Sequence, residues 1–478
     1  MAHSTFDFDL DEETFRQLGH RMIDLMAEAL AAEHQDPVLR KASGRAVRQA
    51  IDGDLPRLGR DPDEVFAACR EAIFPYCRRN GHPRFFGYVS SSADPIGVLA
   101  DGLISALNQN VTAWRSGPAA TTIERQVVRW LDEMVGFAGE GHGLLTSGGS
   151  AANFQGLATA VRRAEERAEL ASGSRNRLTL YVSSEGHLSM AKAGRLLGLA
   201  EDHIRKVAID TERRLRIDDL ERQLAADLAD GLVPAAICLS AGTANTGAID
   251  PLDEAADVAE RHDVWLHIDG AYGAPAAMVP AYRWLRRAFG RADSLSLDPH
   301  KWLYVPLDSG CVLYRDEADS HRAFSLDSEY IAVQQTDPAE TFAFFHHSPD
   351  LSRRFRALKL WMILKVRGVD AMAARIGRDI ALRQRLDEHV RHHPNLEHLG
   401  SELSISCFRY VPDQDVDPEA LNTLNRHILE TLLDEGQIYM SPTTLDGRYS
   451  LRICIVNFRT TEADIDFLLD EVVRLGSR

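Results

Sequence analysis

Lys301 occupies an unusual position for a charged side chain. It lies in SLSLDPHKWLYVPLDSG, residues 294–310, just after a short apolar run that is typical of a strand, and His300 and Trp302 flank it. Burying an ammonium group costs free energy, and a desolvated lysine loses its proton more readily and can attack an aldehyde to form an imine. The alternative interpretation is an exposed lysine at the end of a strand, which this residue alone does not exclude.

Asp269 ends a second apolar run, in DVWLHIDGAYGAP, and small residues follow it. A pyridoxal phosphate ring needs an acid against its pyridine nitrogen, which keeps that nitrogen protonated and makes the ring an electron sink. The ring also needs room beneath it, which Ala271 would leave. An aspartate at this place can instead cap a helix, so Asp269 by itself also permits a purely structural interpretation.

Three further apolar runs end in residues that can bind a cofactor. A glycine-rich turn enters a helix in LLTSGGSAANFQGLATA, where backbone N–H groups and the hydroxyls of Ser147 and Ser150 can hold a phosphate. His187 follows a strand in YVSSEGHLSMAKAG, where an imidazole can stack on a flat ring or transfer protons. Thr243, in LSAGTANTGAID, offers a hydroxyl to the cofactor or the substrate. Each signal is weak alone, because these residue types also build turns, caps and cores.

The elements around these residues alternate between short apolar strands and amphipathic helices, from about residue 81 to 365. Such alternation is typical of a large α/β domain with a mostly parallel sheet and helices on both faces. Ligands bind outside the carboxyl ends of the strands in such sheets. Because the lysine, the aspartate, the histidine and the glycine-rich turn all follow apparent strands, we expect them to meet in one pyridoxal phosphate site.

The two ends of the chain predict smaller units. Residues 1–80 show helical apolar spacing and predict a helical N-terminal segment, whose apolar stripes need a partner such as a second subunit. Residues 366–478 mix helices with strands and predict a small α+β domain. Residues 316–352 lack clean periodicity and form either a mobile lid over the site or an irregular surface loop, and a long helix follows them in SRRFRALKLWMILKVRG.

The composition is that of an ordinary globular protein, with 45% hydrophobic and 26% charged residues. The formal net charge is −17 without a basic run, which argues against a nucleic acid or an anionic membrane as a partner. No stretch reaches the roughly 20 apolar residues that a membrane-spanning helix needs, and the acidic N-terminus shows no signal sequence. The six cysteines are scattered without a CxxC motif, so we expect reduced thiols, no metal site and a cytoplasmic location.

These motifs resemble the group II pyridoxal-5′-phosphate (PLP)-dependent amino-acid decarboxylases, which include aromatic L-amino-acid, histidine, glutamate and 2,4-diaminobutyrate decarboxylases. The resemblance runs from about residue 10 to the C-terminus and is strongest in DPHKWLYVPLDSG, HIDGAYG, TSGGSAAN, HPRFFGYVSS and LSRRFRALKLW. It implies the aspartate aminotransferase-like fold (PLP fold type I), PLP as cofactor, and a homodimer whose active sites lie at the interface. It also implies a carboxy-lyase that converts an amino acid to the amine and carbon dioxide.

The same resemblance implies roles for individual residues. Lys301 corresponds to the lysine that holds PLP as a Schiff base, Asp269 to the partner of the pyridine nitrogen, and His187 to the histidine that stacks on the ring. Tyr330, in SLDSEYIAV, corresponds to the tyrosine of a mobile loop that protonates the α-carbon after carbon dioxide leaves. The positions that hold the phosphate in the family correspond to Gly149, Ser150 and His300.

The expected substrate is an aromatic amino acid (tyrosine, Dopa, tryptophan or phenylalanine), with Tyr88, Trp114 and Leu307 in the side-chain pocket. Asn110, Thr112 and Leu307 depart from the aliphatic or aromatic residues of the animal aromatic decarboxylases. A decarboxylase of 2,4-diaminobutyrate or glutamate is therefore an alternative. An aldehyde synthase of the same family is another, although the loop tyrosine and the stacking histidine that switch the chemistry are both present. A carbon–sulfur or carbon–carbon lyase, or a scaffold protein without PLP, are more distant alternatives.

Overall fold

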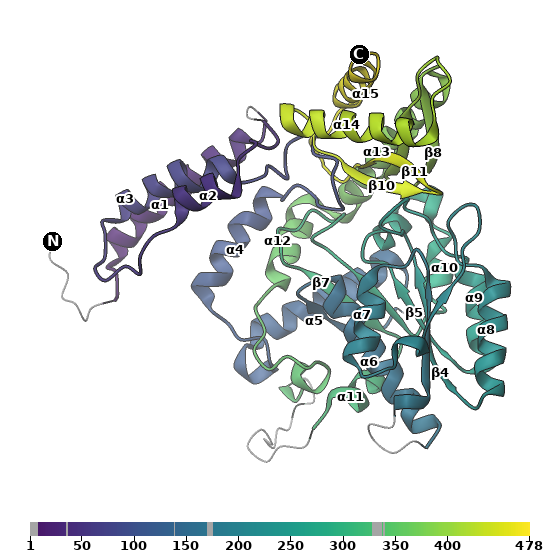
Figure 1. The fold of residues 1–478 in the computed structure, drawn as a ribbon. Helices are drawn as coiled ribbons and strands as arrows, with labels where there is room; N and C mark the ends of the chain where they lie inside the picture. The colour runs from purple at the N-terminus through teal and green to yellow at the C-terminus, as the bar shows by residue number, and fades with distance from the viewer. Residues whose placement is uncertain (1–7, 35–36, 138, 170–174, 327–336, 338–339) are drawn as a thin grey trace.

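The computed structural model describes residues 8–34, 37–137, 139–169, 175–326, 337 and 340–478 (Figure 1). A sheet with helices on both faces forms the centre of the molecule. The C-terminal part packs at one end of this centre, and the N-terminal helices project away from it as an arm (Figure 1). The α/β fold expected from the alternating strands and helices is thus confirmed.

Seven strands form the central sheet within the described residues, in the order β1-β7-β6-β5-β4-β2-β3. The strands from β6 to β3 run parallel, whereas β7 is antiparallel to both β6 and β1, so β1 points the same way as β6. Most of these strands are buried on both faces, which explains their continuous apolar runs. Their bounds are β1 Gly143–Thr146, β2 Leu178–Ser183, β3 Ile204–Val207, β4 Val233–Ser240, β5 Trp265–Asp269, β6 Ser294–Leu297 and β7 Gly310–Tyr314.

Helices cover both faces of this sheet. Helix α6 crosses one face and contacts β4, β5, β6 and β7, whereas α8 and α9 lie on the other face (Figure 1). Helices α5 and α12 pack on each other beside β1, and α4 packs on α12. The bounds are α4 Pro95–Leu107, α5 Pro118–Val135, α6 Gly149–Arg167, α7 Leu188–Leu196, α8 Ile217–Ala229, α9 Leu252–His262, α10 Leu285–Phe289, α11 Glu317–Phe324 and α12 Ala357–Arg367.

The C-terminal part builds a second, antiparallel sheet in the order β10-β11-β9-β8, with α13, α14 and α15 packed on it. Its apolar core is separate from that of the central sheet and includes Phe86, because backbone bonds from Phe86 to Tyr439 and Cys454 attach that segment to the small sheet. The bounds are α13 Val369–His392, β8 Leu396–Glu402, β9 Ile405–Tyr410, α14 Pro418–Glu435, β10 Ser441–Leu445, β11 Arg448–Cys454 and α15 Glu462–Gly476.

The N-terminal arm consists of α1 Glu12–Ala32, α2 Gly44–Ile51 and α3 Pro62–Ala68. Each helix begins at a side-chain cap, from Asp11, Ser43 and Asp61 respectively, which satisfies a free backbone N–H of the first turn. Large apolar side chains along the arm stay exposed, including Leu55 at 72% and Leu58 at 85%. The expected helical segment is present, and its apolar stripes have little to pack against within one chain.

The segment expected to be irregular, residues 316–352, begins with helix α11 instead. Asp316 caps this helix, and its acidic first turn and basic last turn favour the helix dipole, a signal that apolar periodicity does not reveal. The helix expected from SRRFRALKLWMILKVRG starts only at Ala357. Among the helices of the described residues, none is both long and apolar enough to cross a membrane.

A buried ion pair explains why the chain is not yet helical at Arg353. The guanidinium bonds the carboxylate of Glu124 in α5, and both side chains are almost fully buried, at 1% and 0% exposed. It also donates to the carbonyls of Leu145 in β1 at 2.7 Å and Val111 at 3.0 Å. The backbone N–H of Arg353 donates to the amide oxygen of Asn110 at 2.9 Å. This one residue therefore ties α5, β1 and the chain before α12 together.

Replacing Arg353 with methionine should destabilise the fold by about 3–5 kcal/mol, because Glu124 would keep a buried charge without its partner. The measurement is the urea unfolding midpoint of the full chain. Arg354→Met is the matched control, since Arg354 pairs with Asp101 at 3.0 Å at the surface and should cost less than about 1 kcal/mol. An equal loss of unfolding free energy in the two variants would contradict the stabilising role of the buried Arg353–Glu124 pair.

Candidate active site

A cavity of about 390 Å³ lies at the edge of the central sheet where the carboxyl ends of β1, β2, β4, β5 and β6 meet. Each of these strands is followed directly by a loop that lines the cavity. The structure thereby brings together most of the side chains that the sequence singles out, from loops up to about 150 residues apart in the chain. Those that line the cavity are Ser147, Gly149, Ser150, His187, Asp269, Ala271, His300 and Lys301.

Lys301 lies in the turn after β6, and its amine is 3.1 Å from the carboxylate of Asp298. Burial lowers the pKa of this amine, but the negative charges of Asp298 and Asp269 raise it by more, so its pKa lies above the ordinary lysine value. The prediction that desolvation makes Lys301 easy to deprotonate is therefore wrong. Its two acidic neighbours favour the charged amine, so a reaction of this amine with an aldehyde would need another group to take up its proton.

Asp269 is held by three hydrogen bonds at the end of β5. One carboxylate oxygen accepts from the backbone N–H of Ala271 at 3.1 Å and from the hydroxyl of Ser296 at 3.2 Å. The other accepts from the side-chain amide of Asn153 at 2.8 Å. These three bonds fix the direction of the carboxylate. Asp269 is 8% exposed and lines the cavity, so a ring nitrogen placed there would meet an oriented carboxyl group.

The glycine-rich turn after β1 forms a cradle at the start of α6. This helix begins at Gly149, and the backbone N–H groups of Ala151 and Ala152 donate to the carbonyl of Gly148, which leaves those of Gly149 and Ser150 for a ligand at this helix end. A Cβ atom on Gly149 would lie 2.8 Å from Asp298 and 3.0 Å from the Cβ of Ala271, so only glycine fits this close approach. A Cβ on Gly310 would lie 2.5 Å from the Cα of Gly148. The cradle is therefore shaped for a small anion such as a phosphate.

His300 lies beside the cradle and is held in one orientation. Its Nδ1 accepts from the backbone N–H of Ser309 at 3.0 Å, which places the ring proton on Nε2. Burial lowers the pKa of His300, despite the opposing charge of Asp298, so the ring is neutral near pH 7 and offers one N–H donor. His187, the cap of α7, contributes its ring to the same cavity, with Nδ1 2.7 Å from the hydroxyl of Ser189.

Several residues predicted for the site do not line the cavity of one chain. Thr243 is buried, and its hydroxyl lies 3.3 Å from that of Thr246, although its neighbours Gly242 and Ala244 do line the cavity. Tyr88 and Leu307 are 52% and 65% exposed. Trp114 begins a short 3-10 turn, Trp114–Ser116, away from the cavity wall. Tyr330 lies outside the described residues.

Other residues of the cavity were missed by reasoning from the sequence. Asp298, Asn153, Ser189 and Tyr272 all line it. Asp298 and Asn153 lie inside the motifs DPHKW and SGGSAAN, and this position could have marked them as site residues. The residue types alone do not indicate their roles. Tyr272 stacks on Trp302 at 5.0 Å, and its hydroxyl contacts Ser404, which joins the cavity to the C-terminal part.

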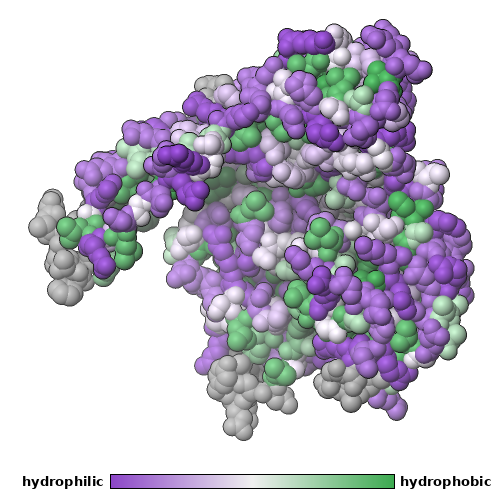
Figure 2. Space-filling view, viewed as in Figure 1, coloured by the Kyte–Doolittle hydropathy of each residue, from purple (hydrophilic) through white to green (hydrophobic). Residues whose placement is uncertain are grey.

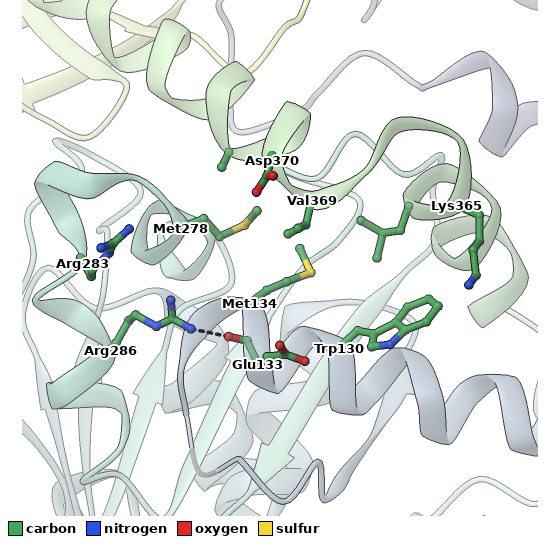
Figure 3. Close-up of a pocket in the computed structure, with 11 residues that line it drawn as sticks. Trp130, Glu133, Met134, Met278, Arg283, Arg286, Lys365, Val369 and Asp370 are labelled. Atoms are coloured by element: carbon green, nitrogen blue, oxygen red, sulfur yellow. Dashed lines mark hydrogen bonds between the residues drawn. The ribbon is translucent and has the colours of Figure 1, made fainter.

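A second cavity, of about 460 Å³, lies between α5, α12 and the start of α13 (Figure 3). Trp130 and Met134 form an apolar wall, and the amine of Lys365 lies 5.3 Å from the centroid of the Trp130 ring. Arg286 points across it and donates to the backbone carbonyl of Glu133 (Figure 3). None of the described residues that line it is a predicted cofactor ligand, so the smaller cavity at the sheet edge is the candidate active site.

Comparisons with known proteins identify the family of the chain. The family model of the pyridoxal-dependent decarboxylase conserved domain matches residues 45–411. An aromatic-L-amino-acid decarboxylase of Bacillus atrophaeus is 33% identical over 460 residues, which are 96% of this chain and 95% of the relative. A phenylacetaldehyde synthase of Petunia hybrida is 29% identical, with 93% of this chain and 91% of the relative covered. The crystal structure of Oryza sativa TDC with PLP and tryptamine matches with a TM-score of 0.93 at 26% identity over 99% of both chains.

The fold and the cavity together define a PLP-dependent enzyme of the aspartate aminotransferase-like class. The chain belongs to the group II PLP-dependent decarboxylase family. It is an amino-acid decarboxylase, and PLP is its cofactor. The described residues fit that cofactor, because one cavity offers a glycine-rich helix start, an oriented carboxyl group and a lysine amine.

The position of Asp298 predicts the pH dependence of Lys301. Asp298→Asn removes a charge that raises the pKa of the amine, so Lys301 should become reactive at a lower pH than in the wild type. The measurement is the rate at which trinitrobenzenesulfonate labels Lys301 across a pH series in the full chain depleted of PLP, read by peptide mass spectrometry. Asp308→Asn is the control, because Asp308 pairs with Arg356 at 2.9 Å. An unchanged midpoint in Asp298→Asn would refute the assignment.

Proposed function

We propose that the chain decarboxylates an aromatic L-amino acid, such as tyrosine, Dopa, tryptophan or phenylalanine, to the amine and carbon dioxide. The observation that carries the proposal is the similarity, over 96% of the chain, to an aromatic-L-amino-acid decarboxylase. The Oryza sativa structure that the chain resembles over 99% of its length also contains an aromatic amine, tryptamine.

An aromatic cluster beside the cavity supports this substrate class. Tyr88 directly precedes Val89, which lines the cavity. The ring of Tyr88 lies 5.9 Å from that of Tyr439, which stacks on Phe85 at 5.2 Å. The guanidinium of Arg78 lies 5.0 Å from all three rings. Flat apolar surface of this kind favours an aromatic side chain through offset or edge-to-face packing.

Lys301, Asp269 and His187 carry the proposed catalytic roles. Lys301 would hold the aldehyde of PLP through its amine. Asp269 would face the pyridine nitrogen with its carboxylate. His187 would lie against the ring face, since it lines the same cavity. When bound, PLP supplies an electron sink for the bond to the departing carboxylate.

The cradle residues are proposed to hold the phosphate of PLP. The N–H groups of Gly149 and Ser150 at the start of α6 would donate to it, with the hydroxyls of Ser147 and Ser150 and the Nε2–H of His300 around them. Ala271 forms the small floor beneath the ring, since its Cβ closes the space beside Gly149. Fixing the phosphate in this way fixes the distance from the ring to Lys301.

Tyr330 is proposed as the proton donor to the carbon that loses carbon dioxide, although it lies outside the described residues. A phenol has an ordinary pKa of about 10, which makes it a weak acid, yet the carbon it protonates is strongly basic. The proposal rests on the position of Tyr330 in SLDSEYIAV. An aldehyde synthase remains the second candidate, because a phenylacetaldehyde synthase covers 93% of this chain.

A substrate with a polar side chain, such as 2,4-diaminobutyrate or glutamate, receives less support from the structure. Asn110 is one of the three residues that suggested it, with Thr112 and Leu307, but its amide oxygen accepts from the backbone N–H of Arg353 at 2.9 Å. That bond is one of the contacts that hold Arg353 in place beside Glu124. The polarity of Asn110 is thus used by the fold, which weakens its case as a substrate ligand.

A homodimer with active sites at the interface is part of the proposal. Helix α4 exposes Leu99, Leu103 and Leu107 at 51%, 46% and 46%, and their spacing of four places them on one face. The arm adds further exposed apolar side chains, such as Leu55 and Leu58. Exposed apolar surface of this extent is typical of protein–protein contacts. A cytoplasmic location is proposed with it, supported by six free thiols.

Product analysis tests the substrate. A screen of the twenty amino acids plus Dopa, 5-hydroxytryptophan and 2,4-diaminobutyrate should give carbon dioxide and amine from aromatic substrates. We expect a kcat/KM at least about tenfold higher for the best aromatic substrate than for diaminobutyrate or glutamate, since those side chains would be left without polar partners. A faster reaction with either polar amino acid would show the substrate proposal to be wrong.

The role of Tyr330 is tested by Tyr330→Phe, which keeps the ring and removes the proton. The variant should form less amine and more aldehyde, ammonia and hydrogen peroxide, because the unprotonated carbon becomes open to oxygen. Quantifying amine and peroxide in the same reaction measures the split. Tyr449→Phe, in the distant strand β11, should behave as the wild type. Amine formed at the wild-type rate without peroxide would exclude Tyr330 as the donor.

The dimer is tested at α4. Leu103→Glu should shift the protein from dimer to monomer in sedimentation velocity, because a charge on an apolar interface is costly to desolvate. Leu228→Glu is a matched control on α8, since Leu228 is exposed to a similar extent, 44% against 46%. A wild-type protein that sediments as a single chain would overturn the homodimer proposal itself.

A further inference from the structure

The buried side-chain amide of Asn153 contacts one proposed ring ligand directly and the other through a serine hydroxyl. The side-chain nitrogen of Asn153, in α6, lies 2.8 Å from the carboxylate of Asp269 and 2.9 Å from the hydroxyl of Ser189. That hydroxyl lies 2.7 Å from Nδ1 of His187. Asn153 is only 1% exposed. Asp269 and His187 are proposed to hold the edge and the face of the same ring. The position of Asn153 therefore allows it to orient both side chains.

The other end of the amide meets a second buried chain of hydrogen bonds. The side-chain oxygen of Asn153 lies 3.0 Å from Nε2 of His267, and Nδ1 of His267 lies 2.8 Å from the hydroxyl of Ser294. The indole N–H of Trp265 donates to the same hydroxyl at 2.8 Å. His267 and Ser294 are fully buried, at 0% exposed. The network therefore runs from the core of the sheet to the cofactor cavity.

The chemistry of the groups gives this network a single direction. The indole of Trp265 can only donate, so the hydroxyl of Ser294 accepts from it and keeps its own proton free for Nδ1 of His267. At the other end, the carboxylate of Asp269 accepts from the amide nitrogen of Asn153, which turns the amide oxygen towards Nε2 of His267. Burial lowers the pKa of His267 to about 4, against the raising effect of Asp269, so the ring is neutral and its one proton is on Nε2. His267 then donates to the amide oxygen of Asn153, which can only accept.

This direction fixes which way the amide faces. With its oxygen towards His267, Asn153 has both amide hydrogens for Asp269 and Ser189. A flipped amide would instead place its oxygen 2.8 Å from the carboxylate of Asp269, which is repulsive. The hydroxyl of Ser189 accepts from Asn153 and donates to Nδ1 of His187. The backbone N–H of Ser189 also donates to Nδ1 of His187, at 3.3 Å. Nδ1 of His187 therefore carries no proton, and its proton is on Nε2.

Gly156 makes room for this arrangement. It lies one turn after Asn153 in α6, and a Cβ there would be 2.9 Å from both Cε1 and Nδ1 of His267 and 3.2 Å from the hydroxyl of Ser294. Any side chain at this position would push His267 away from the amide. The spacing Asn-x-x-Gly in SAANFQG thus belongs to the network, although glycine is unfavourable inside a helix.

We propose that Asn153 is a positioning residue that couples the core of the sheet to the cofactor, orienting the Asp269 carboxylate and fixing the tautomer of His187 through Ser189. This inference rests on the proposed roles of Asp269 and His187. Each hydrogen bond to the carboxylate favours its charged form. Without the amide, the Asp269 carboxylate would lose one of its three hydrogen bonds and its fixed direction, so its alignment with the ring nitrogen would loosen and the electron sink would weaken.

The test reads the protonation of a bound ring rather than turnover. The full chain is depleted of PLP and loaded with 4′-deoxypyridoxine 5′-phosphate, which has the ring and the phosphate but no aldehyde for Lys301. Its near-ultraviolet absorbance reports whether the ring nitrogen is protonated. In the wild type the bound ring should stay protonated to high pH. In Asn153→Leu, which is of similar size, the ring should lose its proton at lower pH and bind at least about tenfold more weakly, a factor equal to about 1.4 kcal/mol.

Two further variants separate positioning from simple damage to the core. His267→Gln keeps a donor towards the oxygen of Asn153 and should keep the wild-type titration. His267→Leu removes that donor, frees the amide to flip, and should behave as Asn153→Leu. Thr159→Val is the control on the same helix: Thr159 is equally buried, and its hydroxyl bonds the carbonyl of Gln155 at 3.0 Å outside the network. It should leave the ring titration unchanged, whatever it does to stability.

The outcomes are distinguishable from a failure of the proposed function. If Asp269→Asn leaves the ring titration unchanged, the role of Asp269 is wrong and this inference falls with it. If Asp269→Asn shifts the titration but Asn153→Leu does not, only the role of Asn153 is overturned. If Asn153→Leu does not fold, as judged by circular dichroism, the two His267 variants decide. Equal titrations for His267→Gln and His267→Leu would then overturn the coupling.

Discussion

The site depends on keeping one lysine cation between two carboxylates at the edge of a buried sheet. The amine of Lys301 lies 3.1 Å from Asp298, and the charge of Asp269 acts on it as well. In a medium of low dielectric constant, an unpaired member of this group would be costly. The parallel direction of β5 and β6 brings the three together, because their carboxyl ends share one edge. The direction of the strands therefore determines which charges lie together at this edge, independently of any contact with the cofactor.

The same constraint explains where the fold uses glycine and where it uses buried polar groups. The turn before α6 must approach the loop after β6 so closely that Gly149 would collide with Asp298 if it carried a side chain. Further along the same helix, Gly156 leaves space for His267. A helix that begins at the anion cradle thus also carries the amide that orients Asp269. Shifting α6 to accommodate a side chain at either glycine would disturb both functions.

The sequence predicted the positions that follow strands far better than the contacts between elements. Lys301 and Asp269 could be found because a charged residue after an apolar run is locally visible. Asn153 and His267 could not, because they are polar residues inside a helix and a strand, and only the packing of α6 on β5 gives them partners. Thr243 was predicted to bind the cofactor or the substrate, but it does not line the cavity of one chain, and its hydroxyl lies beside that of Thr246 in a local turn that no sequence pattern reveals.

The phosphate poses the remaining electrostatic problem, since it would bring more negative charge to a cavity that already holds two carboxylates. His300 does not offset that charge, because burial lowers its pKa and leaves a neutral ring. One oxygen of Asp298 is buried without a hydrogen-bond partner among the described residues, so this carboxyl group adds to the polar groups that the cavity must satisfy. Among the described residues, the amine of Lys301 and the first turn of α6 can offset the charge of a phosphate. Lys301, the residue proposed to react with the aldehyde, would therefore also help the cavity to tolerate the phosphate.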